Sequence, residues 1–208
     1  MGLNTDVKLF WDDCHDKNMV VSLSGCGYDE TIDFLKVRDC IIPGNHVLEV
    51  GVGLGYVTKG LYENKLIVSG LDISKIALER VKNYCESTYL ISELEKLPSD
   101  YFDLIICNNV VQHVATGLLI EELNHFIRSL KISGIFAVEF VSNDVVEDMG
   151  SNPSLDTIKG GGCCRTPSYL ESLIKAAGGI CTLVFDKKVD ISIVKGHHVF
   201  HVKKIKGS

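Results

Sequence analysis

The sequence lacks any long apolar run and any large basic cluster. No segment approaches the about 20 apolar residues that span a bilayer, and no basic stretch followed by an apolar one opens the chain, so we expect neither a membrane span nor a signal peptide. Lysine and arginine number 21 against 27 acidic residues, and the net charge is −6. The only basic cluster is Lys203-Lys204-Ile205-Lys206, which is more typical of a solvated tail than of a nucleic-acid-binding face. These absences predict a cytoplasmic protein with neither nucleic-acid nor membrane partners.

The eight cysteines include no Cys-x-x-Cys pair, so their spacing does not indicate a zinc site. Cys107 and Cys181 lie within apolar runs, which favours buried thiols of a reducing compartment over disulfides. The adjacent Cys163 and Cys164 lie in a glycine-rich stretch and are the exception, open to exposure and oxidation.

With 208 residues and 46% hydrophobic content, the chain is long enough for one full-sized core, so we expect a single domain. Within it the sequence pattern suggests four parts: an N-terminal helical cap at 1–44, a core at 45–141, a lid or substrate loop at 142–165, and a C-terminal helix and strand pair at 166–208. The break after the cap is Ile41-Ile42-Pro43-Gly44.

From residue 45 short apolar strands alternate with helices. The predicted strands are 46–50, 66–72, 88–91, 102–107 and 135–141, with two further β-like runs at 180–185 and 198–202. The predicted helices are 56–62, 74–84, 117–131 and 166–177, and we expect Ser133-Gly134 to end the third of these. Nearly continuous apolar strands indicate a parallel sheet buried on both faces. The pattern therefore predicts an α/β, Rossmann-like, doubly wound seven-stranded sheet, mostly parallel with an antiparallel C-terminal strand, with helices on both faces.

A glycine turn follows the first strand. Gly51, Gly53 and Gly55 allow a ligand to approach the backbone at the carboxyl edge of the sheet, and Asp72 at the end of the second strand is placed to accept both hydroxyls of a ribose. These features fit either a dinucleotide or S-adenosylmethionine (SAM). The third glycine of the dinucleotide fingerprint is replaced by Tyr56. The carboxylate of Glu49 would repel a pyrophosphate but attract the positive amino group and sulfonium of SAM.

Several segments, in order along 45–140, resemble the motifs of the class I SAM-dependent methyltransferases of the small-molecule type. They are Val47-Leu-Glu-Val-Gly-Val-Gly-Leu-Gly55, Gly70-Leu-Asp-Ile-Ser74, Glu93-Leu-Glu-Lys-Leu-Pro98, Tyr101-Phe-Asp-Leu-Ile-Ile-Cys-Asn108 with Val111-Gln-His-Val114, and Leu130-Lys-Ile-Ser-Gly-Ile-Phe136. The last segment departs from the family's Leu-Lys-Pro-Gly-Gly turn at Ile132 and Ser133.

The resemblance implies a role for each matched position. The backbone of Gly51, Gly53 and Gly55 would face the methionine part of SAM, with Glu49 near its amino group. Asp72 would hold the ribose and Ile73 would pack on the adenine. Glu93, where the family more often has aspartate, would accept from the adenine amino group beside the N–H of Leu94. Asn108 and Asn109 would line the floor near the reacting methyl group.

Methyl transfer from a sulfonium is an in-line displacement, so the protein mainly has to align donor and acceptor. An oxygen or nitrogen acceptor also needs a base for its proton, and His113, which follows the fourth strand, is the leading candidate. A structural histidine at a helix start is the alternative at that position. Glu139, within the fifth strand, could instead point into the site or simply end a strand.

Three histidines at 197, 198 and 201 form a group resembling a metal motif, but in a strand His198 points away from the other two, which disfavours a three-ligand metal site. The acceptor pocket is expected from the cap and from 142–165, where Gly160-Gly161-Gly162 suits a hinge. The single tryptophan, Trp11, either closes over the ligands or anchors a helix.

These observations predict an enzyme that transfers a methyl group from SAM to a small-molecule acceptor, with an oxygen or nitrogen nucleophile, releasing S-adenosylhomocysteine. The chain would act as a monomer or homodimer and carries no predicted metal. Two alternatives remain open: an NAD-dependent oxidoreductase of Rossmann fold, and a non-catalytic SAM-binding scaffold protein.

Overall fold

A computed structural model describes residues 5–17, 27–142, 165–191 and 194–205. Its strands are β1 (His46–Val50), β2 (Ile67–Asp72), β3 (Ser87–Leu90), β4 (Phe102–Cys107), β5 (Leu130–Ser142), β6 (Gly179–Ile191) and β7 (Val194–Lys204). The α-helices are α1 (Thr5–Asp16), α2 (Tyr28–Phe34), α3 (Tyr56–Glu63), α4 (Lys75–Val81), α5 (Thr116–Ser129) and α7 (Pro167–Ala176). Short 3₁₀ turns are η1 (Arg38–Cys40), η2 (Ile91–Lys96) and η3 (Val111–His113).

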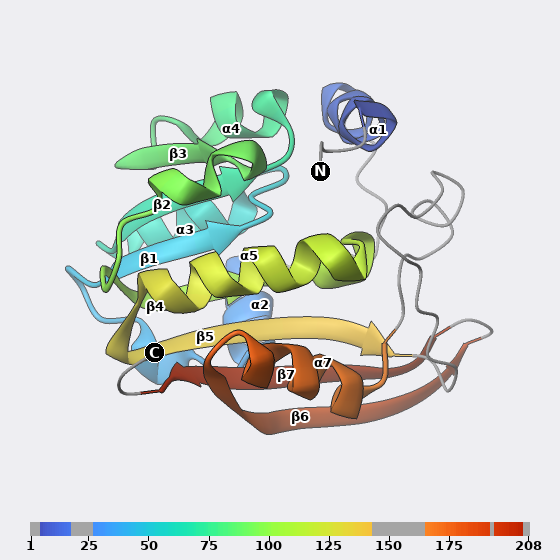
Figure 1. The fold of residues 1–208 in the computed structure, drawn as a ribbon. Coiled ribbons are helices and arrows are strands. Elements are labelled where there is room, and N and C mark those ends of the chain that lie inside the picture. Colours follow the sequence, from blue (N-terminus) through green and yellow to red (C-terminus); the bar gives the residue numbers. More distant parts are fainter. Residues whose placement is uncertain (1–4, 18–26, 143–164, 192–193, 206–208) are drawn as a thin grey trace.

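The strands form one seven-stranded sheet in the order β3-β2-β1-β4-β5-β7-β6 (Figure 1). The pairs from β3 through β5 are parallel, whereas β7 runs antiparallel to both β5 and β6. The predicted fold class, including the antiparallel C-terminal strand, is therefore confirmed.

Helices cover both faces of the sheet because its strands are apolar on both sides. On one face the core joins β1, β4 and β5 to α5 and α7, through residues such as Phe126 and Ile174. On the other face Ile32 and Leu35 of the α2 segment and Leu61 of α3 pack on the same strands, and α4 packs through its own small cluster beside them.

Two helices begin where the sequence predicts their N-caps. The hydroxyl of Ser74 accepts a hydrogen bond from the N–H of Ala77 at 3.3 Å, and α4 follows. The hydroxyl of Thr166 accepts from the N–H of Tyr169 at 3.3 Å, with Pro167 as the first residue of α7. Both caps satisfy a backbone N–H that the helix itself leaves unpaired.

The predicted end of the third core helix is wrong. α5 ends at Ser129, and Leu130 to Gly134 already belong to β5. Gly134 allows β5 to pack closely against β4, because a Cβ at this position would lie 2.9 Å from the carbonyl oxygen of Phe102. The register between β4 and β5 shifts in this region, so the glycine accommodates an irregular strand rather than a helix stop.

The division into cap, core, lid and C-terminal part stays a prediction. Most of the proposed lid, 143–164, with Gly160-Gly161-Gly162 and the Cys163–Cys164 pair, lies outside the described residues. Of the two cysteines expected to be buried thiols, Cys107 is buried and Cys181 is only half-buried, and both are free, as are Cys14, Cys40 and Cys85.

Candidate active site

The glycine turn lies at the carboxyl edge of the sheet, between β1 and α3. Gly51, Gly53 and Gly55 have φ angles of 78°, 51° and 82°, in the left-handed region that favours glycine. A Cβ on Gly51 would lie 2.4 Å from Cγ2 of Val110, which follows β4. At Gly53 the nearest atom to such a Cβ is Cε1 of His15, 3.8 Å away. The turn is thus packed against the β4 loop on one side and faces α1 on another.

Asp72 ends β2 directly beside this turn. Its Oδ2 accepts a hydrogen bond from the N–H of Gly53 at 3.1 Å, and its Oδ1 accepts from the N–H of Ser74 at 2.9 Å. The side chain is buried, and burial raises the pKa of this carboxyl, while the backbone N–H groups and His15 act in the opposite direction. The carboxylate predicted to hold a ribose is therefore fixed at the turn.

Glu49 lies at the end of β1 but is turned towards α3. The hydroxyl of Thr58 donates to its Oε2 at 2.5 Å, and the residue is only 5% exposed. Burial raises the pKa of Glu49 to about 8, against the lowering effect of Thr58, and the nearby Asp72 raises it further. Its predicted place near the amino group of a cofactor stays a prediction.

The predicted adenine contacts lie along the next part of the same edge. Ile73 is half-buried between Asp72 and Ser74, and Leu94 is buried in η2. The carboxylate of Glu93 accepts from Nζ of Lys96 at 2.6 Å and from the N–H of Leu90 at 3.1 Å. The hydrogen bond from Lys96 chiefly lowers the pKa of Glu93. An adenine amino group would have to share this carboxylate with donors that are already in place.

The loop after β4 holds the other predicted residues. Asn109, which follows the half-buried Asn108, has a φ of 58°. Its N–H donates to Oε2 of Glu139 at 2.7 Å, and its side-chain oxygen accepts from the amide of Gln112. His113 ends η3, and its ring meets that of Trp11 edge-on with centroids 5.1 Å apart.

α1 packs against α4 beside the edge of the sheet (Figure 1), and its residue His15 borders the turn at Gly53. The hydroxyl of Ser74 donates to Oδ1 of Asp12 at 2.5 Å, and Nη2 of Arg80 donates to the carbonyl oxygen of His15 at 2.5 Å. Trp11 stacks on His15 with centroids 6.1 Å apart, so its ring lies between His15 and His113. Trp11 is half-buried and contacts the rings of both His15 and His113.

His15 is 8% exposed beside Asp72 and Gly53. Burial lowers its pKa, although the charge of Asp72 acts to raise it. Sequence reasoning did not identify Asp12, His15 or Arg80, because none of them lies in a matched motif. The only available signal was that the cap precedes the core.

The three C-terminal histidines have separate partners. Nε2 of His198 lies 2.6 Å from the hydroxyl of Ser142, and Nε2 of His201 lies 2.7 Å from the carbonyl oxygen of Leu35. His197 instead places Nδ1 3.1 Å from Oε1 of Glu139. Among the residues that the structure describes, no group of three or more His, Cys, Asp or Glu could hold a metal ion.

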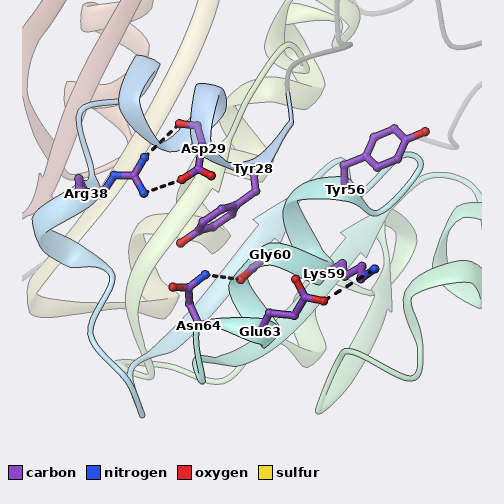
Figure 2. Close-up of a pocket in the computed structure, with 8 residues that line it drawn as sticks. All are labelled: Tyr28, Asp29, Arg38, Tyr56, Lys59, Gly60, Glu63 and Asn64. Carbon is purple, nitrogen blue, oxygen red and sulfur yellow. Dashed lines mark hydrogen bonds and ion pairs between the residues drawn. The ribbon is translucent and has the colours of Figure 1, made fainter.

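A cavity of about 420 Å³ lies away from the strand ends, between α2 and α3 (Figure 2). In it Tyr28 lies against Gly60, and Arg38 is bound to Asp29. Arg38 also donates to Asp33, so its charge is already neutralised on the protein surface. The cavity includes none of the predicted site residues. Its full lining is Tyr28, Asp29, Arg38, Tyr56, Lys59, Gly60, Glu63 and Asn64.

Comparison with known proteins points to one family. Residues 48–138 match the model of a methyltransferase domain. A ubiquinone biosynthesis O-methyltransferase from Coxiella burnetii is 34% identical over 80 residues, which are 35% of this chain and 34% of that relative. The chain thus aligns with about a third of the length of the curated relatives it matches.

Solved structures share the fold at low sequence identity. A SAM-dependent methyltransferase from Methanosarcina mazei has a TM-score of 0.65 at 12% identity, covering 82% of this chain and 97% of that one. A protein described as a putative Zn-dependent alcohol dehydrogenase from Rhodobacter sphaeroides has a TM-score of 0.67 at 11% identity, covering 97% and 100%. At such identities the likeness shows the fold, and the choice of chemistry depends on the site and the family match.

Residues 48–138 are thus similar to a methyltransferase domain, and the sheet that contains them has the fold of the solved methyltransferases. The predicted fold is confirmed, and the match supports the predicted family of class I SAM-dependent methyltransferases.

Proposed function

We propose that this protein transfers a methyl group from SAM to an oxygen or nitrogen nucleophile of a small molecule, an oxygen being favoured, and releases S-adenosylhomocysteine. The observation that carries the proposal is the joined pair of Gly53 and Asp72 within the matched domain. A backbone turn without side chains and a fixed carboxylate beside it suit the methionine and ribose parts of such a cofactor.

The charges at the turn favour SAM over a dinucleotide. Glu49 and Asp72 are both buried carboxyl groups next to the glycine backbone. A pyrophosphate would oppose the ionisation of both acidic side chains, whereas the positive amino group and sulfonium of SAM would favour the ionised carboxylates. Tyr56, which is 61% exposed, stands where a dinucleotide fold needs its third glycine for helix packing.

The proposed roles are those that the family resemblance implies. The Gly51–Gly55 backbone and Glu49 would hold the methionine part, Asp72 the ribose, and Ile73, Leu94 and Glu93 the adenine. Asn108 and Asn109 would lie below the reacting methyl group. When bound, SAM supplies the electrophilic methyl carbon, and the chain's part is to fix donor and acceptor in line and exclude water.

Two observations support a small oxygen acceptor. The curated relative is an O-methyltransferase of ubiquinone biosynthesis. In this chain His15 of α1 borders the turn and Trp11 stacks on His15, a setting that suits a small acceptor better than a macromolecule. We further propose a monomer or homodimer in the cytoplasm with no nucleic-acid partner, in keeping with the net charge of −6. No helix in the described ranges is long and apolar enough to cross a membrane.

Calorimetry with SAM, S-adenosylhomocysteine and NAD tests the choice of cofactor. We expect micromolar binding of SAM and of its product and no binding of NAD; NAD binding without SAM binding would overturn the proposal. Deuterated SAM and a panel of phenols, catechols, carboxylates and amines, read by mass spectrometry, then identify the acceptor. SAM binding without turnover of any acceptor would favour the non-catalytic scaffold.

A further inference from the structure

Glu139 and His197 form a pair at the carboxyl end of β5. Glu139 is opposite Val199 and His197 is opposite Val141 in the antiparallel ladder of β5 and β7, so the two side chains share one face of the sheet. Oε1 of Glu139 lies 3.1 Å from Nδ1 of His197. The glutamate side chain is 3% exposed, whereas that of the histidine is 37% exposed. A buried carboxylate thus holds a histidine that solvent can reach.

The pair fixes the orientation of the imidazole ring. When Nδ1–H donates to the carboxylate, the neutral ring carries its free lone pair on Nε2. No residue in the described part of the chain hydrogen-bonds to Nε2 of His197. A neutral imidazole whose second nitrogen is held by a buried carboxylate has the geometry of a general base.

The other oxygen of Glu139 ties this pair to the cofactor side of the site. Oε2 accepts the N–H of Asn109 at 2.7 Å. The next residue, Val110, packs on Gly51 at the start of the glycine turn. Since Cys107 of β4 is in register with both Val50 of β1 and Val138 of β5, the three strand ends lie side by side. His197 is therefore connected to the turn by one short run of contacts.

We propose that His197 is the general base for the acceptor, and that Glu139 is the residue that positions it. This inference rests on the proposed methyltransferase function. Nε2 of His197 takes the proton of the acceptor hydroxyl. The acceptor oxygen bonds to the methyl carbon while the carbon–sulfur bond breaks and its electron pair stays on sulfur. The imidazolium then returns its proton to solvent.

His197 differs from His113, which sequence analysis favours, in its surroundings. His113 has its ring against Trp11 under the cover of α1. His197 faces Glu139 and is followed by His198 on β7. Lys187 lies opposite His197 on the neighbouring strand β6. His197 is therefore flanked by a carboxylate on β5 and by an ammonium group on β6.

The first test compares His197→Gln, His113→Gln and the control His201→Gln on the full chain. His201 shares the strand and face of His197 but is bonded to the carbonyl of Leu35. For His197→Gln we expect kcat to fall by about 10²–10³-fold, with loss of the acidic limb of the pH–rate profile. The SAM dissociation constant, measured by calorimetry, should stay within about twofold of the wild type. The control should keep kcat within about threefold.

A second readout does not depend on turnover. Nitrogen-15 NMR of the histidine rings should show His197 as the Nδ1–H tautomer in the wild type, and Glu139→Gln should reduce the fraction of this tautomer, because a neutral amide is a weaker acceptor than a carboxylate. Should Glu139→Gln fail to fold by circular dichroism, Glu139→Asp replaces it and should reduce that fraction less.

The outcomes separate the two proposals. Lack of SAM binding by the wild type overturns the proposed function and, with it, the base. Wild-type turnover with a His197→Gln variant of near-normal kcat, or an Nε2–H tautomer of His197, overturns the base alone.

Discussion

The N–H of Gly53 donates to Oδ2 of Asp72 across 3.1 Å, which joins the turn after β1 to the end of β2. The two segments are neighbours only in the folded sheet, since β1 and β2 pair in parallel with Val50 next to Leu71. Because the N–H of Ser74 binds the other oxygen, the carboxylate is held in one orientation. The carboxylate that would bind the ribose is therefore already held in position by backbone N–H groups of the protein.

Replacing Asp72 tests this part of the site. We expect Asp72→Ala to weaken SAM binding more than tenfold, by about 1.4 kcal/mol or more, because the hydroxyls lose a charged acceptor. Asp72→Asn should show most of the loss, since its amide has one acceptor oxygen for two N–H donors and the hydroxyls. Asp39→Asn, at an exposed aspartate of η1, is the control and should bind normally. Unchanged affinity in Asp72→Ala, measured by calorimetry, would refute the ribose assignment.

Glu49 predicts a pH-dependent stability. Its pKa in the folded protein is about 8, above the ordinary value of 4.5. Below pH 4.5 the folded and the unfolded protein both keep the proton of Glu49. Between pH 4.5 and about pH 8 the unfolded chain releases this proton, whereas the folded protein retains it. The contribution of this carboxyl to stability is thus fully present at low pH and is lost as pH rises through about 8.

A glutamine at this position removes that dependence and can still accept from Thr58. We expect the Tm of Glu49→Gln minus the Tm of the wild type to be larger at about pH 8.5 than at about pH 5, by about 5 °C or more. Glu63→Gln on α3, where the carboxylate is 61% exposed, should show little such change. Equal Tm differences at both pH values for Glu49→Gln, measured by calorimetric scans, would contradict the prediction.

Arg165 supports the turn that carries His113. It is buried, and its guanidinium donates to the carbonyl oxygens of Val111 at 2.9 Å and Val114 at 2.5 Å. It also donates to the hydroxyl of Thr116 at the start of α5. Arg165, two residues before the start of α7, thus holds η3 and the start of α5 in place.

Arg165→Met should lower the free energy of unfolding by about 3 kcal/mol, because buried carbonyl groups lose charged donors. Arg38→Met, which removes only exposed ion pairs to Asp29 and Asp33, should cost less than about 1 kcal/mol. Urea denaturation measures both variants. Equal losses would show that Arg165 acts merely as a surface charge.

Local signals in the sequence were sufficient for most of the fold. β4 has the predicted bounds, and Ser74 and Thr166 cap the predicted helices, because periodicity and capping are properties of neighbouring residues. The end of α5 was misplaced since Ser133-Gly134 has the composition of a stop. Its actual role is set by Phe102 on a neighbouring strand, a contact between residues distant in the sequence.

In the candidate site, too, features with a local sequence signal were predicted and features that depend on distant contacts were not. The glycine turn and Asp72 were predicted because a motif links them at fixed spacing. His15 was not assigned a role, and Glu139 was considered only as a residue that could point into the site, without its partner His197. Each of these contacts joins residues that are far apart in the sequence. No spacing rule connects Glu139 to a residue on β7 before the strand order is known.

Trp11 offers a direct report on the cap. It is the single tryptophan of the chain, and its ring lies between His15 and His113 above the glycine turn. Because His15 borders Gly53, SAM bound at the turn must change the surroundings of the indole. We expect SAM to shift the tryptophan emission and to reduce its quenching by acrylamide, at concentrations that match the calorimetric dissociation constant.

Asp12→Asn and Ser74→Ala provide the comparison, because each weakens the hydrogen bond that holds α1 against α4. Both variants should show more quenching than the wild type before SAM is added, and Ser74→Ala will also lose the N-cap of α4, so Asp12→Asn is the cleaner variant. Lys17→Gln, which removes only an exposed pair with Asp13 near the end of α1, should behave as wild type. If calorimetry detects SAM binding while emission and quenching stay constant, α1 does not lie over the bound cofactor, and the acceptor pocket must then be formed without it.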